Sequence, residues 1–269
     1  MEIMSTEETV RVLIEAWKLM VGCFPGAKIE HAHAVATTFA NLPLPFLNLS
    51  MPDRPLPAPQ DLRAALTVIK KRAKSCEYAS LVALCDSWAP PEWERIAAEE
   101  GFALALNMTG MATDQLLPPR RPLPKLEFRR VSDQTTARDL AMINGQAYKM
   151  SLDLFECLCN LHLWHQDSFG YVGYSADKAV TCAAVFPVAG TIYVAFVATL
   201  PESHGKGCAE AVVRHAIEQG RRALSLAGKT LTRMTLHASD MGRPVYSAMG
   251  FDSGARVVLL EPQHQTIPS

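Results

Sequence analysis

Several features that would place this chain in a specialised class of proteins are missing from its sequence. No apolar run is long enough to cross a bilayer, and the N-terminal stretch MEIMSTEETV is acidic and lacks the basic and apolar segments of an export signal. The formal net charge of −1 creates no overall field that would attract nucleic acid or an anionic membrane. We therefore expect a cytoplasmic protein that binds neither nucleic acid nor membranes.

Paired cysteines are missing as well. The seven cysteines form no Cys-x-x-Cys pair, and most of them lie in apolar stretches. This pattern favours buried thiols in a reducing compartment over disulfides or a zinc site. His31 and His33 are two residues apart, so on a helix they would point to different faces. We expect no metal site.

Glycine is absent between Ala27 and Glu100, but two glycines occur close together in the second half, in the sequence HGKGCA from His204 to Ala209. An uncharged run rich in β-branched and aromatic residues, Thr191–Leu200, comes before them and predicts a buried strand. The residues after them predict an amphipathic helix, because apolar side chains recur there at steps of three and four.

This strand-to-helix junction suits a phosphate group. Glycines let the backbone turn sharply and approach a ligand closely. The first amides of a helix are unsatisfied donors at the positive end of its dipole, and Lys206 adds a positive charge beside them. We expect a phosphate or pyrophosphate to bind at this loop, and no such loop in the first half of the chain.

A run of prolines divides the chain. With 269 residues, of which 49% are hydrophobic, the chain is long enough for one large domain or two of ordinary size. The stretch LLPPRRPLPKLEF has four prolines around two arginines and favours an extended connector. An interdomain linker is the simpler interpretation, and a PxxP motif for an SH3-like partner is the alternative. We place the boundary near Pro122, between domains 1–122 and 123–269.

Periodicity and helix-breaking residues predict regular elements in both domains. The first domain has three expected helices, Ser5–Met20, Gln60–Lys74 and Pro91–Glu100, and three expected strands, Pro45–Met51, Tyr78–Cys85 and Phe102–Met108, with Ile29–Ala40 left unassigned. The second domain is expected to contain the strand Leu126–Val131, the helices Ser132–Tyr148 and Ser151–Trp164, the strands Gly170–Tyr174, Ala179–Pro187 and Thr191–Leu200, the helix after the glycines, the strand Leu231–Ala238, the helix Gly242–Met249 and the strand Ala255–Leu260.

Two stretches of the second domain resemble motifs of the GNAT acyltransferase superfamily. VATLPESHGKGCA resembles its acyl-CoA motif, which usually reads Arg or Gln, two residues, Gly, one residue, then Gly or Ala; Gly207 and Ala209 fit, and His204 departs from it. LHASDMGRPVYSAMGF resembles a second motif, in which a tyrosine, here Tyr246, lies four residues before Gly-Phe. The order of elements over residues 126–262 is also the GNAT order. The resemblance implies an α+β or α/β fold of the GNAT acyl-CoA N-acyltransferase type, with a mixed, mostly antiparallel sheet flanked by helices.

The first domain repeats part of this pattern. WERIAAEEGFALALNM has the same layout as VYSAMGFDSGARVVLL, namely a short helix, Gly-Phe and a strand. Aligning Gly101 with Gly250 places Ala97 where Tyr246 stands. We interpret the chain as two tandem GNAT-like units, the first a degenerate copy without the glycine loop and the tyrosine. An unrelated α/β cap is the alternative.

The resemblance implies an N-acetyltransferase that transfers an acetyl group from acetyl-CoA to an amine by direct attack on the thioester. The backbone of Val197 and Ala198 would polarise the thioester carbonyl, as an oxyanion hole does. Tyr246 would be the general acid that protonates the leaving thiolate. Ser239 stands where the second motif often has an asparagine near the cofactor arm. The residues implied to bind the cofactor are Val197, Ala198, Thr199, His204, Gly205, Lys206, Gly207, Cys208, Ala209 and Ser239.

The sequence leaves the general base and the acceptor open. Thr191–Leu200 contains no carboxylate, although many members of the superfamily carry a glutamate on this strand. The candidate bases by position are His165, Asp167, His237 and Asp240, with a water relay as the alternative. The acceptor is expected to be a small-molecule or peptide amine. Residues that could line its pocket are Tyr148, Met150, Phe155 and Trp164.

Two other functions fit the same residues. The missing strand carboxylate and His204 in place of Arg are compatible with a non-catalytic acyl-CoA-binding or regulatory module. The first domain could also bind protein partners, or act as a cap or dimer-forming domain. We expect a monomer or a homodimer.

Overall fold

The computed structural model describes residues 4–164 and 167–263, which form two compact units. Unit 1 contains residues 111–253, and unit 2 contains residues 4–110 together with the last strand from Gly254 onward. The chain passes from one unit to the other within β5 (Phe102–Thr113), after Gly110, and within β11 (Asp252–Pro262), after Ser253. The units do not meet at Pro122, where the prolines led us to place the boundary. Residues 111–122 belong to unit 1, because they bond within it: the amide of Leu117 donates to the carbonyl of Met249, and Arg121 donates to that of Gly205.

The sheet of unit 1 has the strand order β10-β9-β8-β7-β6. Its strands are β6 (Glu127–Arg130), β7 (Phe169–Ser175), β8 (Lys178–Val188), β9 (Thr191–Thr199) and β10 (Met234–Ser239). β9 and β10 run parallel, and the other neighbouring strands run antiparallel. The sheet is therefore mixed and mostly antiparallel, as expected.

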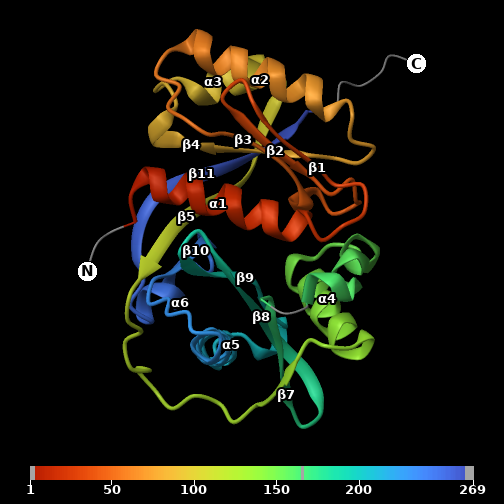
Figure 1. The fold of residues 1–269 in the computed structure, drawn as a ribbon, viewed down its shortest axis with the longest axis vertical. Coiled ribbons are helices and arrows are strands. Elements are labelled where there is room, and N and C mark those ends of the chain that lie inside the picture. Colours follow the sequence, from red (N-terminus) through yellow and green to blue (C-terminus); the bar gives the residue numbers. More distant parts are fainter. Residues whose placement is uncertain (1–3, 165–166, 264–269) are drawn as a thin grey trace. The chain divides into compact units, whose positions relative to one another are not determined.

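Helices cover both faces of this sheet. They are α4 (Gln134–Tyr148), α5 (Cys208–Leu226) and the short α6 (Arg243–Ala248). On one face, Val212, Val213 and Ile217 of α5 pack with Ile192 and Val194 of β9 in a single buried cluster. On the other face, α4 lies against β8 and β9, and the two helices stand on opposite sides of these strands in Figure 1. The amphipathic pattern thus places α5 directly behind the strand that precedes it.

The stretch that we predicted as one helix, Ser151–Trp164, is instead two 3₁₀ helices, η3 (Leu152–Cys159) and η4 (Leu161–Trp164). The buried residues Phe155 and Leu158 of η3 are three positions apart, which is one turn of a 3₁₀ helix. Asn160, between the two helices, has φ −69° and ψ 107° and so leaves the helical region. The prediction of an α-helix here was wrong.

The sheet of unit 2 has the order β1-β2-β3-β4-β11-β5. The elements before β5 are α1 (Thr6–Val21), β1 (Lys28–Ala32), β2 (Val35–Phe39), the 3₁₀ helix η1 (Pro45–Leu47), β3 (Asn48–Pro52), α2 (Pro59–Ala73), β4 (Leu81–Cys85), the 3₁₀ helix η2 (Asp86–Trp88) and α3 (Trp93–Glu99). The unassigned stretch 29–40 forms the hairpin of β1 and β2. Its turn residues His33 and Ala34 have φ of 55° and 62°, and because neither is the glycine or asparagine usual in such turns, the sequence carried no hairpin signal.

The first half of the chain repeats the topology of the second half. The succession α1-β1-β2-β3-α2-β4-α3-β5 has the same order as α4-β7-β8-β9-α5-β10-α6-β11. The pairing agrees as well. β1–β2 and β2–β3 are antiparallel, like β7–β8 and β8–β9, and β3–β4 is parallel, like β9–β10. The hairpin that the sequence did not reveal completes this correspondence.

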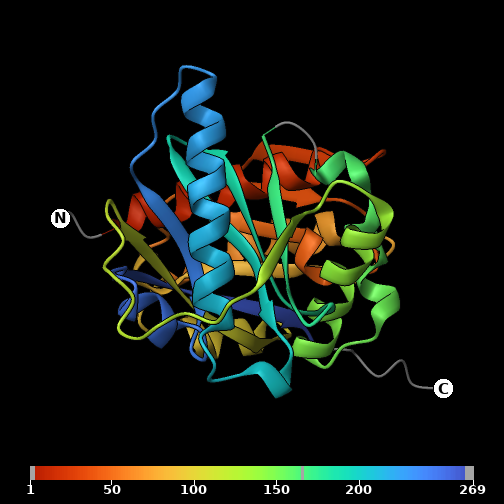
Figure 2. The same cartoon turned by 90° about the horizontal axis from the view of Figure 1, so that it is seen from below.

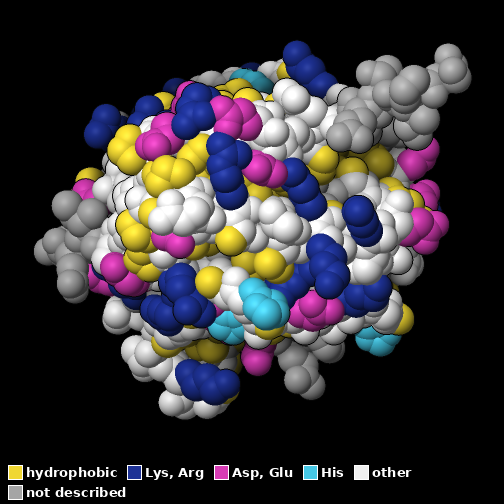
Figure 3. Space-filling view, turned by 90° about the horizontal axis from the view of Figure 1, so that it is seen from above, with side chains coloured by type: hydrophobic (Ala, Val, Ile, Leu, Met, Phe, Trp, Pro, Cys, Tyr) yellow, Lys and Arg dark blue, Asp and Glu magenta, His cyan; other side chains and the backbone are white. Residues whose placement is uncertain are grey.

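Charges of both signs alternate on the surface over α2 and α3. Arg63 pairs with Glu99 and Glu100, Lys70 pairs with Glu100, and Arg95 pairs with Glu99. Figure 3 shows the same intermixing of basic and acidic side chains on this face. Among the described residues, no helix has both the length and the apolar character needed to cross a membrane.

Candidate active site

β9 and β10 pair over only part of their lengths. Their parallel register runs from Ile192 opposite Met234 to Val194 opposite Leu236, although β9 continues to Thr199 and β10 to Ser239. The two strands therefore separate beyond Val194. Backbone of β9 that is not used by β10 becomes available to a ligand inserted between them.

A β-bulge lies where this separation begins. Ala195 is opposite Ala184 and Ala198 is opposite Cys182, so Phe196 and Val197 together face one residue of β8. Phe196 has φ 50°, a left-handed conformation that is costly for an aromatic residue. Such a bulge turns the backbone of β9 away from the regular ladder.

Buried polar contacts hold the bulge in place. Sγ of Cys182 donates to the carbonyl of Phe196 (3.4 Å) and accepts from Nδ2 of Asn144 on α4 (3.2 Å). Burial raises the pKa of the Cys182 thiol to about 12, so the thiol stays protonated and can donate. Oγ1 of Thr181 donates to the carbonyl of Ala198 (3.0 Å). Neither the Cys182 thiol nor the Asn144 amide is exposed, which indicates that both groups support the bulge.

Among the residues expected on this strand, Val197 is half-buried and packs against the core of unit 1, and Ala198 is buried. The hydroxyl of Thr199 is used inside the protein, since it lies 2.7 Å from Oγ1 of Thr181. Any contact of Thr199 with the cofactor arm would therefore come from its backbone.

The glycine loop has the conformation that its glycines predict. Gly205 and Gly207 have φ of 72° and 80°, and Gly207 is the N-cap of α5 without any side-chain cap. A Cβ at Gly205 would meet nothing within 4 Å. Cys208 is buried and Ala209 is half-buried at the start of the helix. The first amides of α5 therefore have no side chain competing with a bound anion.

His204 is engaged within the protein. Its Nε2 lies 2.8 Å from the carbonyl of Thr199, and because a carbonyl only accepts, this nitrogen carries the proton and donates. The ring thereby ties the glycine loop to the end of β9. Lys206 is exposed. The pKa of Glu202 is lowered by its hydrogen bond to Lys178 and further by the charge of Lys206, which also opposes the burial that raises the pKa of Cys208.

Glu210, in the first turn of α5, is turned away from the helix start. Its carboxylate lies 2.7 Å from Nη2 of Arg214, one turn further along, and both side chains are largely buried. Nη2 of Arg214 also donates to the carbonyl of Leu117 (2.6 Å). The negative charge at the loop is thus balanced by a fixed guanidinium.

Tyr246 lies on α6 with 8% of its surface exposed, and its ring meets that of Phe251 edge to face at 5.9 Å. Burial raises the pKa of its phenol, and the Tyr148 hydroxyl adds to the rise. Tyr246 therefore keeps its proton at neutral pH. Oγ of Ser239, expected near the cofactor arm, accepts from the amide of Gly242 (3.3 Å) and so helps to set the turn before α6.

Of the four candidate bases, His237 is the one that the structure places against a buried tyrosine, Tyr193. Nδ1 of His237 lies 3.1 Å from the Tyr193 hydroxyl. Burial raises the pKa of Tyr193, and the phenol of Tyr246 adds to the rise. Asp167 and Asp240 are exposed, and His165 lies outside the described residues.

The expected acceptor-lining residues separate into two groups. Phe155 and Trp164 are core residues, and the indole of Trp164 packs edge-on against Phe196 at 5.8 Å. Tyr148 is 48% exposed and Met150 is half-buried, so these two alone of the four reach a surface. No group of three or more metal-ligating side chains is found in the part of the chain that the structure describes.

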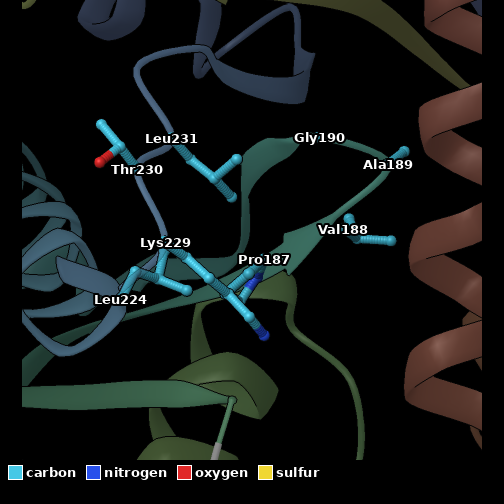
Figure 4. Close-up of a pocket in the computed structure, with 8 residues that line it drawn as sticks. All are labelled: Pro187, Val188, Ala189, Gly190, Leu224, Lys229, Thr230 and Leu231. Carbon is cyan, nitrogen blue, oxygen red and sulfur yellow. The ribbon is translucent and has the colours of Figure 1, made fainter. Parts of the chain in front are cut away.

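A hollow of about 430 Å³ occurs at the other end of β9, around the β8–β9 turn (Figure 4). It is lined by Pro187, Val188, Ala189, Gly190, Leu224, Lys229, Thr230 and Leu231. Its one ionisable side chain is Lys229, and it offers no pair of groups for acid–base chemistry. We assign it no ligand.

Comparison with known proteins gives a clear result for the fold. The sequence matches no protein-family model, and a comparison with curated proteins gave no match. Among solved structures, a GCN5-related N-acetyltransferase from Kribbella flavida is similar with a TM-score of 0.69 and 19% identity over 98% of both chains. The chain has the GNAT fold.

Other GNAT structures agree over most of the chain. A GCN5-related N-acetyltransferase from Sphaerobacter thermophilus matches with a TM-score of 0.54 and 13% identity, covering 94% of this chain and 91% of the other. A tandem GNAT protein from the clavulanic acid biosynthesis pathway matches with a TM-score of 0.51 and 13% identity, covering 88% and 80%. The fold prediction, including two GNAT-like units in tandem, is confirmed.

In this GNAT fold, sequence reasoning overlooked Arg121. Its Nη2 donates to the carbonyl of Gly205 (2.7 Å), so a residue from the proline-rich stretch lies on the glycine loop. The sequence signal was two adjacent arginines among four prolines, which we read as a linker. Asn144 and Cys182 were also missed, because nothing local to them shows that they support a bulge on another strand.

Proposed function

We propose that this chain is an N-acetyltransferase that uses acetyl-CoA and transfers the acetyl group to an amine of a small molecule or peptide. The observation that carries the proposal is the combination of three parts in unit 1: a strand pair that separates at a bulge, an uncapped helix start behind two glycines, and a protonated tyrosine. Each part meets a separate requirement of acyl transfer. In the described part of unit 2, β3 pairs with β2 without a register shift, no glycine lies between β3 and α2, and Ala97 stands at the place of the tyrosine.

The glycine loop fixes the donor. The amides of residues 205–209 would hold the pyrophosphate, because they are unpaired donors at the positive end of α5. The arm of the cofactor would then run between the separated ends of β9 and β10, where Ala195–Thr199 has lost its pairing to β10. This path ends at the bulge.

The bulge and Tyr246 act on the thioester. Backbone amides around Val197 would stabilise negative charge on the carbonyl oxygen while the amine nitrogen forms a bond to the carbonyl carbon. As the carbon–sulfur bond breaks, the sulfur takes the electron pair and then the phenolic proton of Tyr246. The raised pKa of Tyr246 keeps this proton in place over the whole neutral range.

The amine must lose a proton before or during attack. His237 is the titratable side chain that we assign to this step, since it lies on β10 beyond the last residue paired with β9 and contacts Tyr193. His237 would accept the proton directly or through a water. The acceptor would approach on the side of Tyr148 and Met150, which are the surface residues of the expected pocket.

A non-catalytic acyl-CoA-binding module is the second candidate, because β9 contains no carboxylate. Release of free CoA thiol from acetyl-CoA in the presence of a panel of amines separates the two. Turnover above the amine-free rate, with an acetylated amine identified by mass spectrometry, supports the enzyme. Tight CoA binding without turnover of any amine supports the binding module.

A further inference from the structure

The proline-rich stretch from Leu117 to Pro124, here called the strap, lies beside the glycine loop of the same unit. Its first residue is held through both backbone groups: the amide of Leu117 donates to the carbonyl of Met249 (2.9 Å), and its carbonyl accepts from Arg214 (2.6 Å). At the other end, Cδ of Pro124 is 3.5 Å from the position of a Cβ at Gly207. Figure 2 shows the yellow-green strap passing across the N-terminal part of α5.

Arg121 is the residue through which the strap reaches the loop. Its Nη2 donates to the carbonyl of Gly205 at 2.7 Å, and its Nε and Nη2 lie 3.8 Å from the Cβ position at Gly207. The side chain is exposed. A guanidinium has five N–H donors, and the contact with Gly205 uses one of them. The other donors and the positive charge lie next to the uncapped start of α5.

Three other basic side chains near the loop are already engaged with protein groups. His204 gives its proton to the carbonyl of Thr199, Lys178 lies 2.6 Å from Glu202, and Arg214 lies 2.7 Å from Glu210. Within the described part of the chain, neither Arg121 nor Lys206 has a carboxylate at ion-pair distance. Of these two, Arg121 is the one already positioned by a hydrogen bond to the loop.

We propose that Arg121 binds a phosphate group of the CoA nucleotide, so that the strap is part of the donor site. This inference rests on the acetyl-CoA-dependent function proposed above. The planar guanidinium matches two phosphate oxygens at once. Because Arg121 is already held against Gly205, it loses less freedom on binding than an unattached side chain does. Arg121 thereby places a guanidinium at the loop, where the motif position itself holds His204.

The test measures binding of CoA and of dephospho-CoA, which lacks the 3′-phosphate, to the full chain by calorimetry. The variants are Arg121→Gln, Arg121→Lys and the control Arg120→Gln, which removes the same charge from the neighbouring exposed residue. Arg121→Gln should weaken CoA binding about tenfold, the scale of one charge-assisted hydrogen bond. Arg120→Gln should change it by less than about twofold, as expected for a screened surface charge. Arg121→Lys should fall between them.

The two ligands identify the phosphate. A loss for CoA and dephospho-CoA alike assigns Arg121 to the diphosphate, and a loss for CoA alone assigns it to the 3′-phosphate; both results support the proposal. Equal affinity in wild type and Arg121→Gln, or equal losses in Arg121→Gln and Arg120→Gln, would overturn it. If the wild-type chain itself binds no CoA, the proposed function fails as well, so the two failures are distinguishable.

Discussion

The segments that follow β9 in unit 1 and β3 in unit 2 occupy equivalent places in the two units but differ in nearly every chemical respect. After β9 come two glycines with positive φ and a helix without a side-chain cap. After β3 comes the stretch DRPLPAP, in which Leu56 is buried in the core of unit 2 and its amide donates to the carbonyl of Trp88 (2.7 Å). The first loop is open to a ligand, whereas the second is closed by its own side chains.

The helix starts differ in the same way. Each helix has an acidic residue at its third position, Glu210 in α5 and Asp61 in α2. Glu210 is turned toward Arg214, but Asp61 accepts from the amide of Ala58 (3.3 Å) and so places its charge at the helix start. A carboxylate there takes the place that a phosphate would need.

β3 and the tyrosine position complete the comparison. All five residues of β3 are buried and pair with β2 in one continuous register, so β3 has no counterpart of the Phe196 bulge. Ala97, at the place of Tyr246, is buried in the same core cluster as Trp93 and Ile96. A fold can therefore be kept by apolar burial alone, while binding and proton transfer need particular residues in particular conformations.

The largest effect is expected from separating the two units. A fragment of residues 123–269 loses Met111 from the core of unit 1 and leaves the buried β11 residues Val257–Leu260 without β4. Each buried Val or Leu contributes about 1.5–3 kcal/mol. The fragment should show no cooperative thermal transition by circular dichroism, and co-expression of residues 1–122 should restore it. If the fragment melts cooperatively and binds CoA without residues 1–122, then unit 1 does not depend on them for folding, and this prediction is wrong.

Removing the Tyr246 hydroxyl should take from unit 1 most of the catalytic activity that distinguishes it from unit 2. Tyr246→Phe keeps the ring against Phe251 but lacks the proton donor, so kcat should fall by roughly 10²–10⁴-fold with CoA affinity unchanged. Because the pKa of Tyr246 is raised, wild-type kcat should show no alkaline loss from this group below about pH 10. An unchanged kcat in Tyr246→Phe would assign proton donation to water or another residue.

A charge in the glycine loop should make it resemble the helix start of unit 2. Gly207→Asp puts a side chain at φ 80° and a negative charge where phosphate would bind, and CoA affinity should fall by about 100-fold or more. Gly190→Asp is the matched control. Gly190 also has a positive φ, 79°, and a Cβ there would meet nothing within 4 Å, but Gly190 lies in the β8–β9 turn. Similar affinity losses in the two variants, measured by calorimetry, would show that backbone strain and not the loop is responsible.

The smallest effect is expected in unit 2. Asp61→Asn removes the charge that caps α2 and should lower the free energy of unfolding by about 0.5–1 kcal/mol. Calorimetry should still find one CoA per chain, since the closed loop and the missing bulge remain. A second bound CoA in this variant would mean that Asp61 alone keeps unit 2 from binding.

Residues that act through their immediate neighbours were predictable from the sequence. The glycine loop, the strand before it, the helix after it and the Gly-Phe turn after Tyr246 all depend on local backbone preferences, and the structure has them where expected. The order of elements in unit 1 followed from the same local signals. The helix boundaries were also close: Ser5 caps α1 by accepting from the amide of Glu8.

Features that depend on distant partners came only from the tertiary structure. The 3₁₀ form of residues 152–164, the hairpin of β1 and β2, the bulge at Phe196 and the units to which the ends of β5 and β11 belong are all decided by packing and pairing with other segments. The same holds for Arg121. The sequence alone determined that unit 1 has a loop suited to phosphate. That Arg121 reaches this loop was decided by a contact between residues far apart in the chain, and local propensity contains no information about such contacts.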